Sequence, residues 1–140
     1  MKKIKGLIIL LTVVVTLFGS GCSRDESSQA EETSQKIVSY EQISQNEAKN
    51  LMETEKDYVI IDARTEEEFA QGHIEGAILI PEYEISQRAE NELPNKDQLI
   101  LVYCRSGRRS KIASQALADL GYSNVKEFGG IIDWQYGIVK

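Results

Sequence analysis

The stretch QLILVYCRSGRRSK, residues 98–111, decides how the rest of the chain is organised. Residues 98–104 hold a long apolar run, which is typical of a central strand that is buried on both faces. Gly107 then allows the unusual backbone dihedrals of a tight turn, and apolar residues follow at helical spacing. The stretch therefore predicts a strand that ends at Cys104, a turn, and a helix that begins near Arg109 or Ser110.

The alternation of strand and helix extends over most of the chain. Short apolar runs predict strands at 36–40, 58–62, 76–81, 98–104 and 124–128. Helical patterns are found at 44–55, 65–72 and 109–121; residues 82–92 are helical or looped, and a terminal turn or helix begins at 129–134. Strands that alternate with short helices predict an α/β fold with a central, mostly parallel five-stranded sheet and helices on both faces.

The N-terminus differs from this pattern. Residues 1–21 combine a basic start, an apolar run of about a dozen residues and small residues before Cys22, as a bacterial export signal does. The apolar run is shorter than the roughly 20 residues that a membrane-spanning helix needs. The sequence therefore predicts a protein that works outside the cytosol.

Cys22 indicates how such a protein would be held at the cell membrane. Its position resembles the lipid-modified first residue of a lipoprotein, although Gly19 stands where that signal usually carries leucine. Residues 22–36 would then be the lipidated cysteine and a flexible polar tether, and residues 37–140 the folded domain. An ordinary secretory signal or an uncleaved anchor remains the alternative.

The charge of the chain limits its partners. The net charge is −6, and removal of residues 1–21, which contain Lys2, Lys3 and Lys5 and no acidic residue, lowers it by three to −9. An acidic protein of this kind is not expected to bind nucleic acid or an anionic membrane surface by charge. We expect a monomer. The positively charged side chains at 105–111 are a local exception in this acidic chain and call for an explanation of their own.

Those cations surround Cys104 at a place where α/β sheets bind ligands, the carboxyl end of a central strand. Backbone N–H groups of the turn, the N-terminal end of the following helix, and Arg105, Arg108 and Arg109 all favour the thiolate over the thiol. The alternative is a buried cysteine beside arginines that face water. Because arginine is unfavourable at a helix N-terminus unless an anion sits there, we favour a nucleophilic Cys104.

The cysteine count narrows the chemistry further. The chain has two cysteines and one histidine. If Cys22 carries lipid, Cys104 has no partner for a disulfide or a dithiol redox cycle, and no C-x-x-C motif is present. One cysteine and one histidine do not make a four-ligand zinc site. We therefore expect neither metal nor cofactor.

Four segments together make the domain similar to a known family. They are IIDARTEEEFAQGHIEGAILIP (60–81), VYCRSGRRS (102–110), LADLGYSNV (117–125) and FGGIIDW (128–134). In order and spacing they resemble a single-domain rhodanese, over about residues 37–136. The resemblance implies the rhodanese-like fold and a sulfurtransferase. Its cysteine would take a sulfane sulfur from a thiosulfate-like or persulfide donor, and pass it to a thiophilic acceptor.

The resemblance maps Cys104 onto the sulfur-carrying cysteine. It maps Arg105, Ser106, Gly107, Arg108 and Arg109 onto the loop that cradles it. Related phosphatases use a longer loop, C-x5-R, whereas here Arg109 is the fifth residue after Cys104 and Ser110 the sixth. The shorter loop fits a single sulfur better than a phosphate. A phosphatase, or a module that carries a persulfide or binds an anion without turnover, remains the alternative.

Other polar residues have weaker claims. Asp62 and Arg64 lie at the end of the strand at 58–62 and should be near the cysteine loop, where a structural ion pair or cap is favoured over substrate contact or support of the loop. His73 is expected to be structural, because the loop itself supplies the thiolate. Trp134 and the glycines at 129–130 should close the core or line the pocket rim. The acidic residues at 66–68 are expected to face solvent at the start of a helix.

Overall fold

The computed structural model describes residues 39–140. The predicted signal, Cys22 and the tether up to residue 36 lie outside these residues. The described part contains one five-stranded sheet in which every pairing is parallel, with the order β1-β5-β4-β2-β3. The strands are β1 (Glu41–Gln42), β2 (Tyr58–Asp62), β3 (Ala77–Leu79), β4 (Leu99–Cys104) and β5 (Val125–Gly130).

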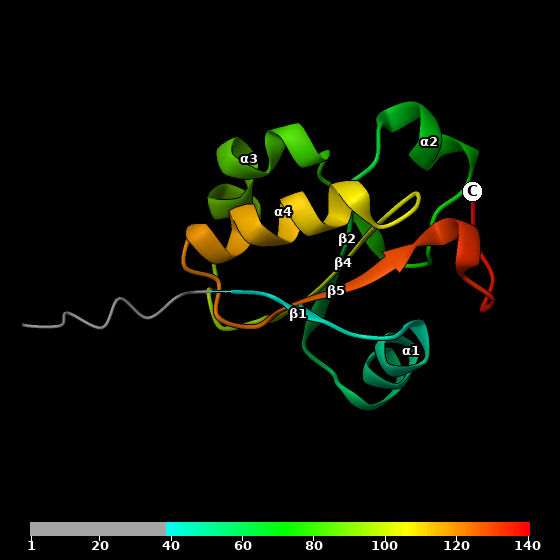
Figure 1. The fold of residues 1–140 in the computed structure, drawn as a ribbon, viewed down its shortest axis with the longest axis horizontal. Helices are drawn as coiled ribbons and strands as arrows, with labels where there is room; N and C mark the ends of the chain where they lie inside the picture. The colour runs from blue at the N-terminus through cyan, green and yellow to red at the C-terminus, as the bar shows by residue number, and fades with distance from the viewer. Residues whose placement is uncertain (1–38) are drawn as a thin grey trace, which may run out of the picture. The chain divides into compact units, whose positions relative to one another are not determined.

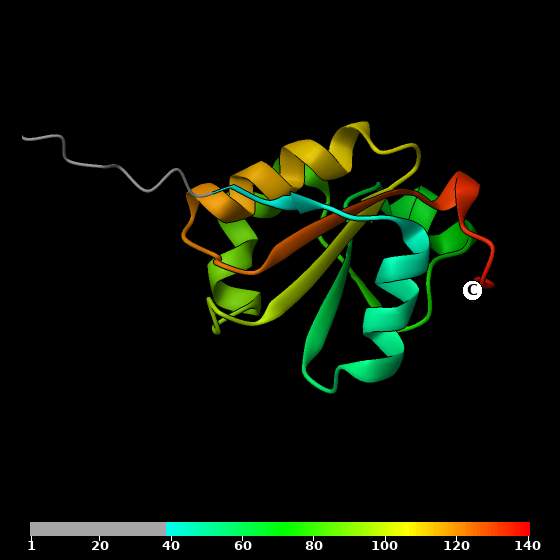
Figure 2. The same cartoon turned by 60° about the horizontal axis from the view of Figure 1, so that its bottom comes forward.

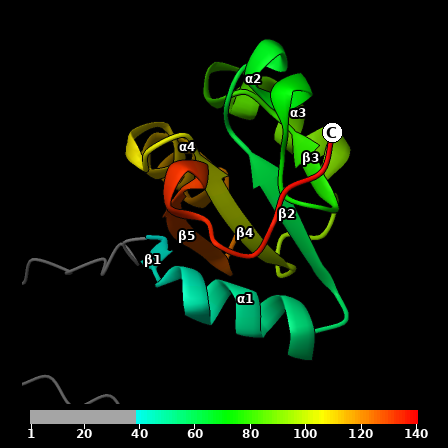
Figure 3. The ribbon, with the colours of Figure 1, turned by 90° about the vertical axis from the view of Figure 1, so that its right-hand side faces the viewer.

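The helices form the outer layers of the sheet (Figures 1 and 2). They are α1 (Gln45–Thr54), α2 (Glu66–Gln71), α3 (Ile85–Glu92) and α4 (Arg108–Asp119), with the short 3-10 turns η1 (Glu82–Glu84) and η2 (Ile131–Asp133). Helix α1 covers one face, α3 and α4 cover the other, and α2 lies beyond the carboxyl end of β2 (Figure 3). This is the α/β architecture with helices on both faces that the sequence predicts.

Strand β4 is the centre of the molecule, and all six of its residues are buried. Because side chains alternate along a strand, the residues Leu99, Leu101 and Tyr103 join the core beneath α1. Ile100, Val102 and Cys104 join the larger core beneath α3 and α4. Strand periodicity therefore places the Cys104 side chain on the α4 side of the sheet.

Ser44 with Glu47 and Thr65 with Glu68 have the Ser/Thr-x-x-Glu spacing of a capping box, and this explains where two helices begin. The Ser44 side chain caps α1 by accepting a hydrogen bond from the N–H of Glu47 at 3.2 Å. At α2 the box is reciprocal: Thr65 accepts from the N–H of Glu68, and the Glu68 side chain accepts from the N–H of Thr65. Both caps satisfy N–H groups that a helix start leaves free.

Several boundaries differ from the predictions, and the strand expected at 76–81 is shortened to Ala77–Leu79. The strand expected at 36–40 is wrong in its described part, since β1 consists of Glu41 and Gln42, which pair with Lys126 and Glu127. Cross-strand pairing, with an ion pair between Glu41 and Lys126, sets this edge rather than the apolar run before it. Strand β5 extends to Gly130, and α4 begins one residue before Arg109.

Within residues 39–140, no helix is long and apolar enough to cross a membrane.

Candidate active site

Cys104 is the last residue of β4, and its side chain is 1% exposed. The chain then turns through residues 105–107 and enters α4 at Arg108. Within the described residues Cys104 is the free cysteine. The backbone N–H of Gly107 donates a hydrogen bond to its sulfur at 3.1 Å. The sulfur thus lies at a strand–turn–helix junction, as the sequence predicts.

Gly107 makes this junction possible. It has φ 96° and ψ −15°, a left-handed conformation that favours glycine, and it occupies the N-cap position of α4 without a capping side chain. The first N–H groups of α4 are therefore not taken by a cap. They remain available to an anionic sulfur at the positive end of the helix.

The environment of Cys104 acts on its pKa in two directions. Burial raises the pKa of the thiol, and hydrogen bonds from the hydroxyl and N–H of Ser110 and from the N–H groups of Ser106 and Gly107 lower it. The hydrogen bonds prevail, so the pKa of Cys104 lies below its ordinary value. The largest of these hydrogen bonds is that of the Ser110 hydroxyl, and the charges of Cys104 and Arg109 also favour each other, so hydrogen bonds and one of the three predicted arginines act together.

Strand β5 braces the turn from behind. Pairing shifts from Val102–Glu127 to Cys104–Gly130, so β5 contains one extra residue at this point, a β-bulge. A Cβ atom on Gly130 would lie 2.3 Å from the carbonyl oxygen of Arg105 and 2.5 Å from Cα of Ser106. Only glycine leaves room for this close approach, so Gly130 belongs to the cradle although the sequence indicated merely a pocket rim.

A hollow of about 280 Å³ opens in front of the turn. We call it the mouth, and its lining residues are Arg64, Glu68, Gln71, Arg105, Ile131 and Ile132. They belong to α2 or follow the ends of β2, β4 and β5, so the mouth is built at the carboxyl edge of the sheet. Ile132 is 62% exposed, which gives the mouth one open apolar wall.

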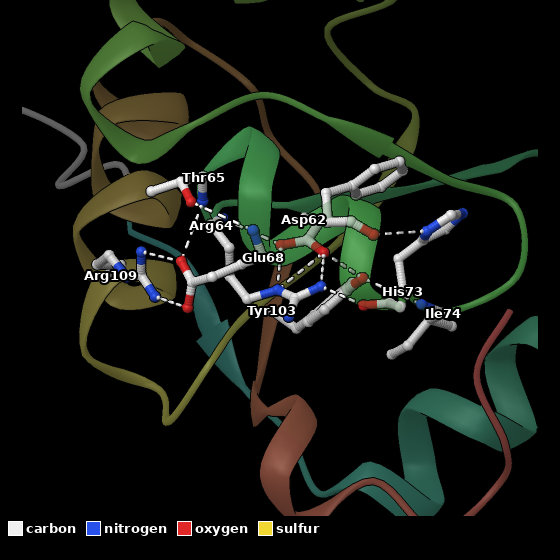
Figure 4. Close-up of polar contacts among 10 residues, drawn as sticks. Asp62, Arg64, Thr65, Glu68, His73, Ile74, Tyr103 and Arg109 are labelled. Carbon is white, nitrogen blue, oxygen red and sulfur yellow. Dashed lines mark hydrogen bonds and ion pairs between the residues drawn. The ribbon is translucent and has the colours of Figure 1, made fainter. Parts of the chain in front are cut away.

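The three predicted arginines have different surroundings. Arg105 is exposed and lines the mouth, whereas Arg108 is exposed outside it. Arg109 is half-buried and donates two hydrogen bonds to the carboxylate of Glu68, at 2.7 and 2.8 Å (Figure 4). Within the described residues, no side-chain hydrogen bond or ion pair engages Arg105 or Arg108. Of the three arginines, Arg105 is thus the one that lines the mouth with its guanidinium unengaged among the described contacts.

The pairing with Arg109 corrects the expectation for the acidic run at 66–68. Glu66 and Glu67 are exposed, but Glu68 faces the site and is 24% exposed. Its hydrogen bonds from Arg109 lower the pKa of the Glu68 carboxyl to about 2. Glu68 therefore neutralises Arg109 and ties α2 to the start of α4. The only sequence signal was its place in the capping box, which did not reveal the second partner.

Asp62 and Arg64 form a buried polar cluster with Tyr103 (Figure 4). The Arg64 guanidinium donates to both oxygens of Asp62, at 2.7 to 3.0 Å, and to the carbonyl of Gly72 at 2.7 Å. The Tyr103 hydroxyl donates to Asp62 at 2.6 Å and accepts from the N–H of Ile74 at 3.1 Å. The predicted ion pair is therefore present, and its further partners are Gly72 and Tyr103; sequence reasoning missed Tyr103.

His73 and Trp134 have structural contacts. The His73 ring stacks on Phe69 with centroids 3.7 Å apart, and its Nδ1 lies 3.1 Å from the Phe69 carbonyl oxygen. Its backbone forms an antiparallel bridge with Val139. Trp134 packs against Phe128 in the core beneath α1. Neither residue contacts the sulfur in any described interaction, in agreement with the structural roles expected for them.

Sequence reasoning also missed Ser110 and Glu127, which lie directly behind the sulfur. Ser110 is fully buried in the first turn of α4, and Glu127 is 3% exposed on β5. A signal existed, because alternation along 124–128 places Glu127 on the same face as Val125, which belongs to the core. An acidic residue on that face requires a partner. Among residues 39–140, no group of acidic, histidine or cysteine side chains could hold a metal ion.

Known proteins are similar to this chain in sequence and in fold. A family model described as the rhodanese-like domain matches residues 44–136. The thiosulfate sulfurtransferase PspE of Escherichia coli (strain K12) is 40% identical over 73 residues, which are 52% of this chain and 70% of that protein. YrkF of Bacillus subtilis (strain 168), provisionally named a sulfur carrier protein, is 33% identical over 105 residues, 74% of this chain and 56% of that protein.

A solved structure described as a rhodanese with anions from E. coli is similar with a TM-score of 0.56. It shares 37% sequence identity, and the match covers 59% of this chain and 98% of that one. The fold expected from the sequence is confirmed by this likeness and by the parallel sheet.

Proposed function

The chain belongs to the rhodanese-like domain family, and on that premise we propose that Cys104 carries sulfur between a donor and an acceptor. Sulfur transfer is the function that the related proteins support, since their names describe a thiosulfate sulfurtransferase and a sulfur carrier. The observation that carries the proposal for Cys104 is its environment. Its sulfur is buried at the end of β4, accepts an N–H at 3.1 Å, and has a lowered pKa.

The reaction follows from a thiolate in a cradle of N–H donors. The Cys104 thiolate attacks the outer sulfur of thiosulfate; the sulfur–sulfur bond of the donor breaks, and sulfite leaves with the electron pair. The product is a persulfide anion whose negative terminal sulfur is stabilised by N–H groups of the turn and of the first turn of α4. An acceptor such as cyanide then attacks that sulfur, thiocyanate leaves, and the thiolate is restored.

Turnover with thiosulfate and cyanide tests this proposal. In the full-length chain, Cys104→Ser should lower the rate of sulfur transfer by roughly a thousandfold or more, because a serine hydroxyl is not ionised at neutral pH. The matched control is Cys22→Ser, which removes the other cysteine and should leave turnover in detergent solution unchanged. Turnover that survives in a folded Cys104→Ser protein would rule out Cys104 as the sulfur carrier.

A carrier without turnover is the second candidate, because YrkF, provisionally named a sulfur carrier protein, is among the matching proteins. Such a carrier would accept one sulfur from a donor and hold it for a partner protein. A single equivalent of sulfite released per chain, with an increase in mass of one sulfur atom on Cys104, would favour the carrier. Repeated release of thiocyanate would favour the enzyme.

We propose further that the mature protein begins at a lipidated Cys22 and is held on the outer side of a cell membrane. The export-type pattern of residues 1–21 and the position of Cys22 support this proposal. Intact mass analysis of the protein isolated from its host tests it. Loss of residues 1–21 with an added acyl mass is expected, and an unmodified N-terminus would defeat the proposal.

A further inference from the structure

A carboxylate lies behind the cradle, and the chemistry of sulfur transfer does not use it. Glu127 belongs to β5, where it pairs in register with Val102 of β4. Side chains of paired residues point to the same face of a sheet, so Glu127 points to the face that carries Cys104. The residue is 3% exposed. A buried carboxylate is costly unless hydrogen bonds satisfy it, so its partners indicate its purpose.

Two donors meet the same oxygen of Glu127. The hydroxyl of Ser110 lies 2.6 Å from Oε1, and the N–H of Gly129 donates to Oε1 at 2.9 Å. Ser110 Oγ also lies 3.0 Å from the carbonyl oxygen of Gly107 and 3.4 Å from that of Gly129. The carboxylate is both the shortest contact and the charged one, and such hydrogen bonds are stronger than those to neutral carbonyls.

Ser110 is linked to the sulfur through Gly107, whose carbonyl oxygen lies 3.0 Å from Ser110 Oγ and whose N–H donates to Cys104 at 3.1 Å. The Ser110 hydroxyl is also the foremost of the hydrogen-bond donors that lower the pKa of the Cys104 thiol. A serine hydroxyl has one proton, so it cannot donate fully to the sulfur and to the carboxylate. Glu127 and the Cys104 thiolate therefore compete for one proton.

We propose that Glu127 is a positioning residue that holds the Ser110 hydroxyl proton away from Cys104 and leaves the sulfur to the backbone N–H groups. A thiolate with one hydrogen bond fewer is more basic and more nucleophilic, since nucleophilicity falls as thiol acidity rises. Glu127 would thus set how reactive the sulfur is without touching a substrate. The meaning of this for sulfur transfer rests on the proposed function, whereas the competition for the proton does not.

Other charged groups surround this pair. Glu68 of α2 and Arg64, which follows β2, line the mouth, and they pair with Arg109 of α4 and Asp62 of β2. Arg105 lies in the turn. Lys111 of α4 and Asp133 of η2 line, together with Glu127, a groove on the other side of the turn. A test therefore has to leave all of these unchanged and vary Glu127 and Ser110 alone.

The rate at which iodoacetamide alkylates Cys104, measured against pH, reports the thiolate directly. In Glu127→Gln the neutral amide is a weaker acceptor than the carboxylate, so the Ser110 proton should turn to the sulfur. The midpoint of the profile should then move about one unit toward acid, and the limiting rate at high pH should fall. Cys22→Ser serves as the common background, so that one thiol reacts.

A double-mutant cycle separates the hydroxyl from simple charge repulsion. When Ser110→Ala is already present, Glu127→Gln should shift the midpoint much less than it does when Ser110 is intact. Equal shifts in the two backgrounds would show that Glu127 acts by its charge alone and would overturn the proposal. No shift in either background, with normal folding, would reduce Glu127 to a structural role and overturn it as well.

Glu127→Asp keeps the charge but shortens the side chain, so that it no longer reaches Ser110. Its profile should move toward acid as in Glu127→Gln, and a profile equal to that of the parent protein would count against the proposal. Circular dichroism and thermal melting establish that each variant is folded. Because alkylation needs no sulfur donor, this result stands even if turnover with thiosulfate fails, which separates it from the proposed function.

Discussion

Strands β2 and β4 lie side by side, and each ends in a polar group, but the two ends are built differently. At the end of β2, Asp62 is fully buried and its oxygens are saturated by Arg64 and Tyr103. At the end of β4, the donors of the turn converge on one sulfur atom that can change its charge. A buried charge with all its partners stabilises a structure, whereas donors directed at a reactive atom stabilise a chemical state.

Replacement of Asp62, whose oxygens are saturated at the end of β2, should have the largest effect on stability. Asp62→Ala leaves the Arg64 guanidinium buried and unpaired, and it also removes the acceptor of the Tyr103 hydroxyl. The free energy of unfolding should fall by about 3–5 kcal/mol, measured by urea denaturation. In the double variant Asp62→Ala, Arg64→Met part of this loss should return, because the unpaired charge is gone. A loss below about 1 kcal/mol in Asp62→Ala would place the cluster among weak surface pairs.

Breaking the cradle should cost activity more than stability. Gly130→Ala puts a Cβ atom 2.3 Å from the Arg105 carbonyl oxygen and forces the turn away from β5. Sulfur transfer should fall about a hundredfold, because a displacement near 1 Å at a reacting centre has that effect. Gly121→Ala is the control: Gly121 has φ 91° with open space around it, so this change should cost about 1 kcal/mol of stability and leave the activity unchanged.

The ion pair between Glu68 and Arg109, which ties α2 to α4, should lose its stabilising effect at low pH. Since the folded pKa of Glu68 is depressed to about 2, its contribution to stability is complete above the unfolded pKa near 4.3. That contribution is lost as the pH falls from there through about 2. Urea denaturation between pH 6 and pH 2, roughly, should show a loss of about 1–2 kcal/mol that Glu68→Gln does not show. Parallel curves for the two proteins would mean that the pair with Arg109 contributes nothing.

The exposed arginines should give the smallest effects. Arg105→Ala should lower kcat/KM for thiosulfate about tenfold, and less at high salt, because it removes an exposed cation from the mouth. Arg108→Ala is the matched control, since Arg108 is exposed outside the mouth. It should change kcat/KM by less than about twofold. Equal losses in the two variants would mean that general positive charge, and not the position of Arg105, attracts the donor.

The sequence was sufficient to predict the order of strands and helices along the chain. Apolar runs located the central strands, two capping boxes located the starts of α1 and α2, and Gly107 located the turn. These features depend on neighbouring residues, so a local pattern is enough. The first strand was misplaced, because a two-residue edge strand is defined by its pairing with β5 and not by its own residues.

The candidate site divides in the same way. Cys104 and its loop are contiguous, so their chemistry could be read from spacing. Glu68 with Arg109, Tyr103 with Asp62, and Ser110 with Glu127 are pairs of residues that are 41, 41 and 17 positions apart. Such pairs arise only when strands from distant parts of the chain lie in register, which a sequence pattern does not specify.

The sequence by itself determined a thiol at a strand–turn–helix junction, and with it the chemistry that this junction is suited to perform. Only the tertiary structure decided which charged side chains pair with one another. It also decided which arginine side chain stays unengaged among the described contacts, and which carboxylate lies behind the sulfur. The physical reason is that a thiolate cradle is made by consecutive backbone N–H groups. The partners that tune it are brought together by the register of β5 against β4 and by the packing of α2 and α4 at one edge of the sheet.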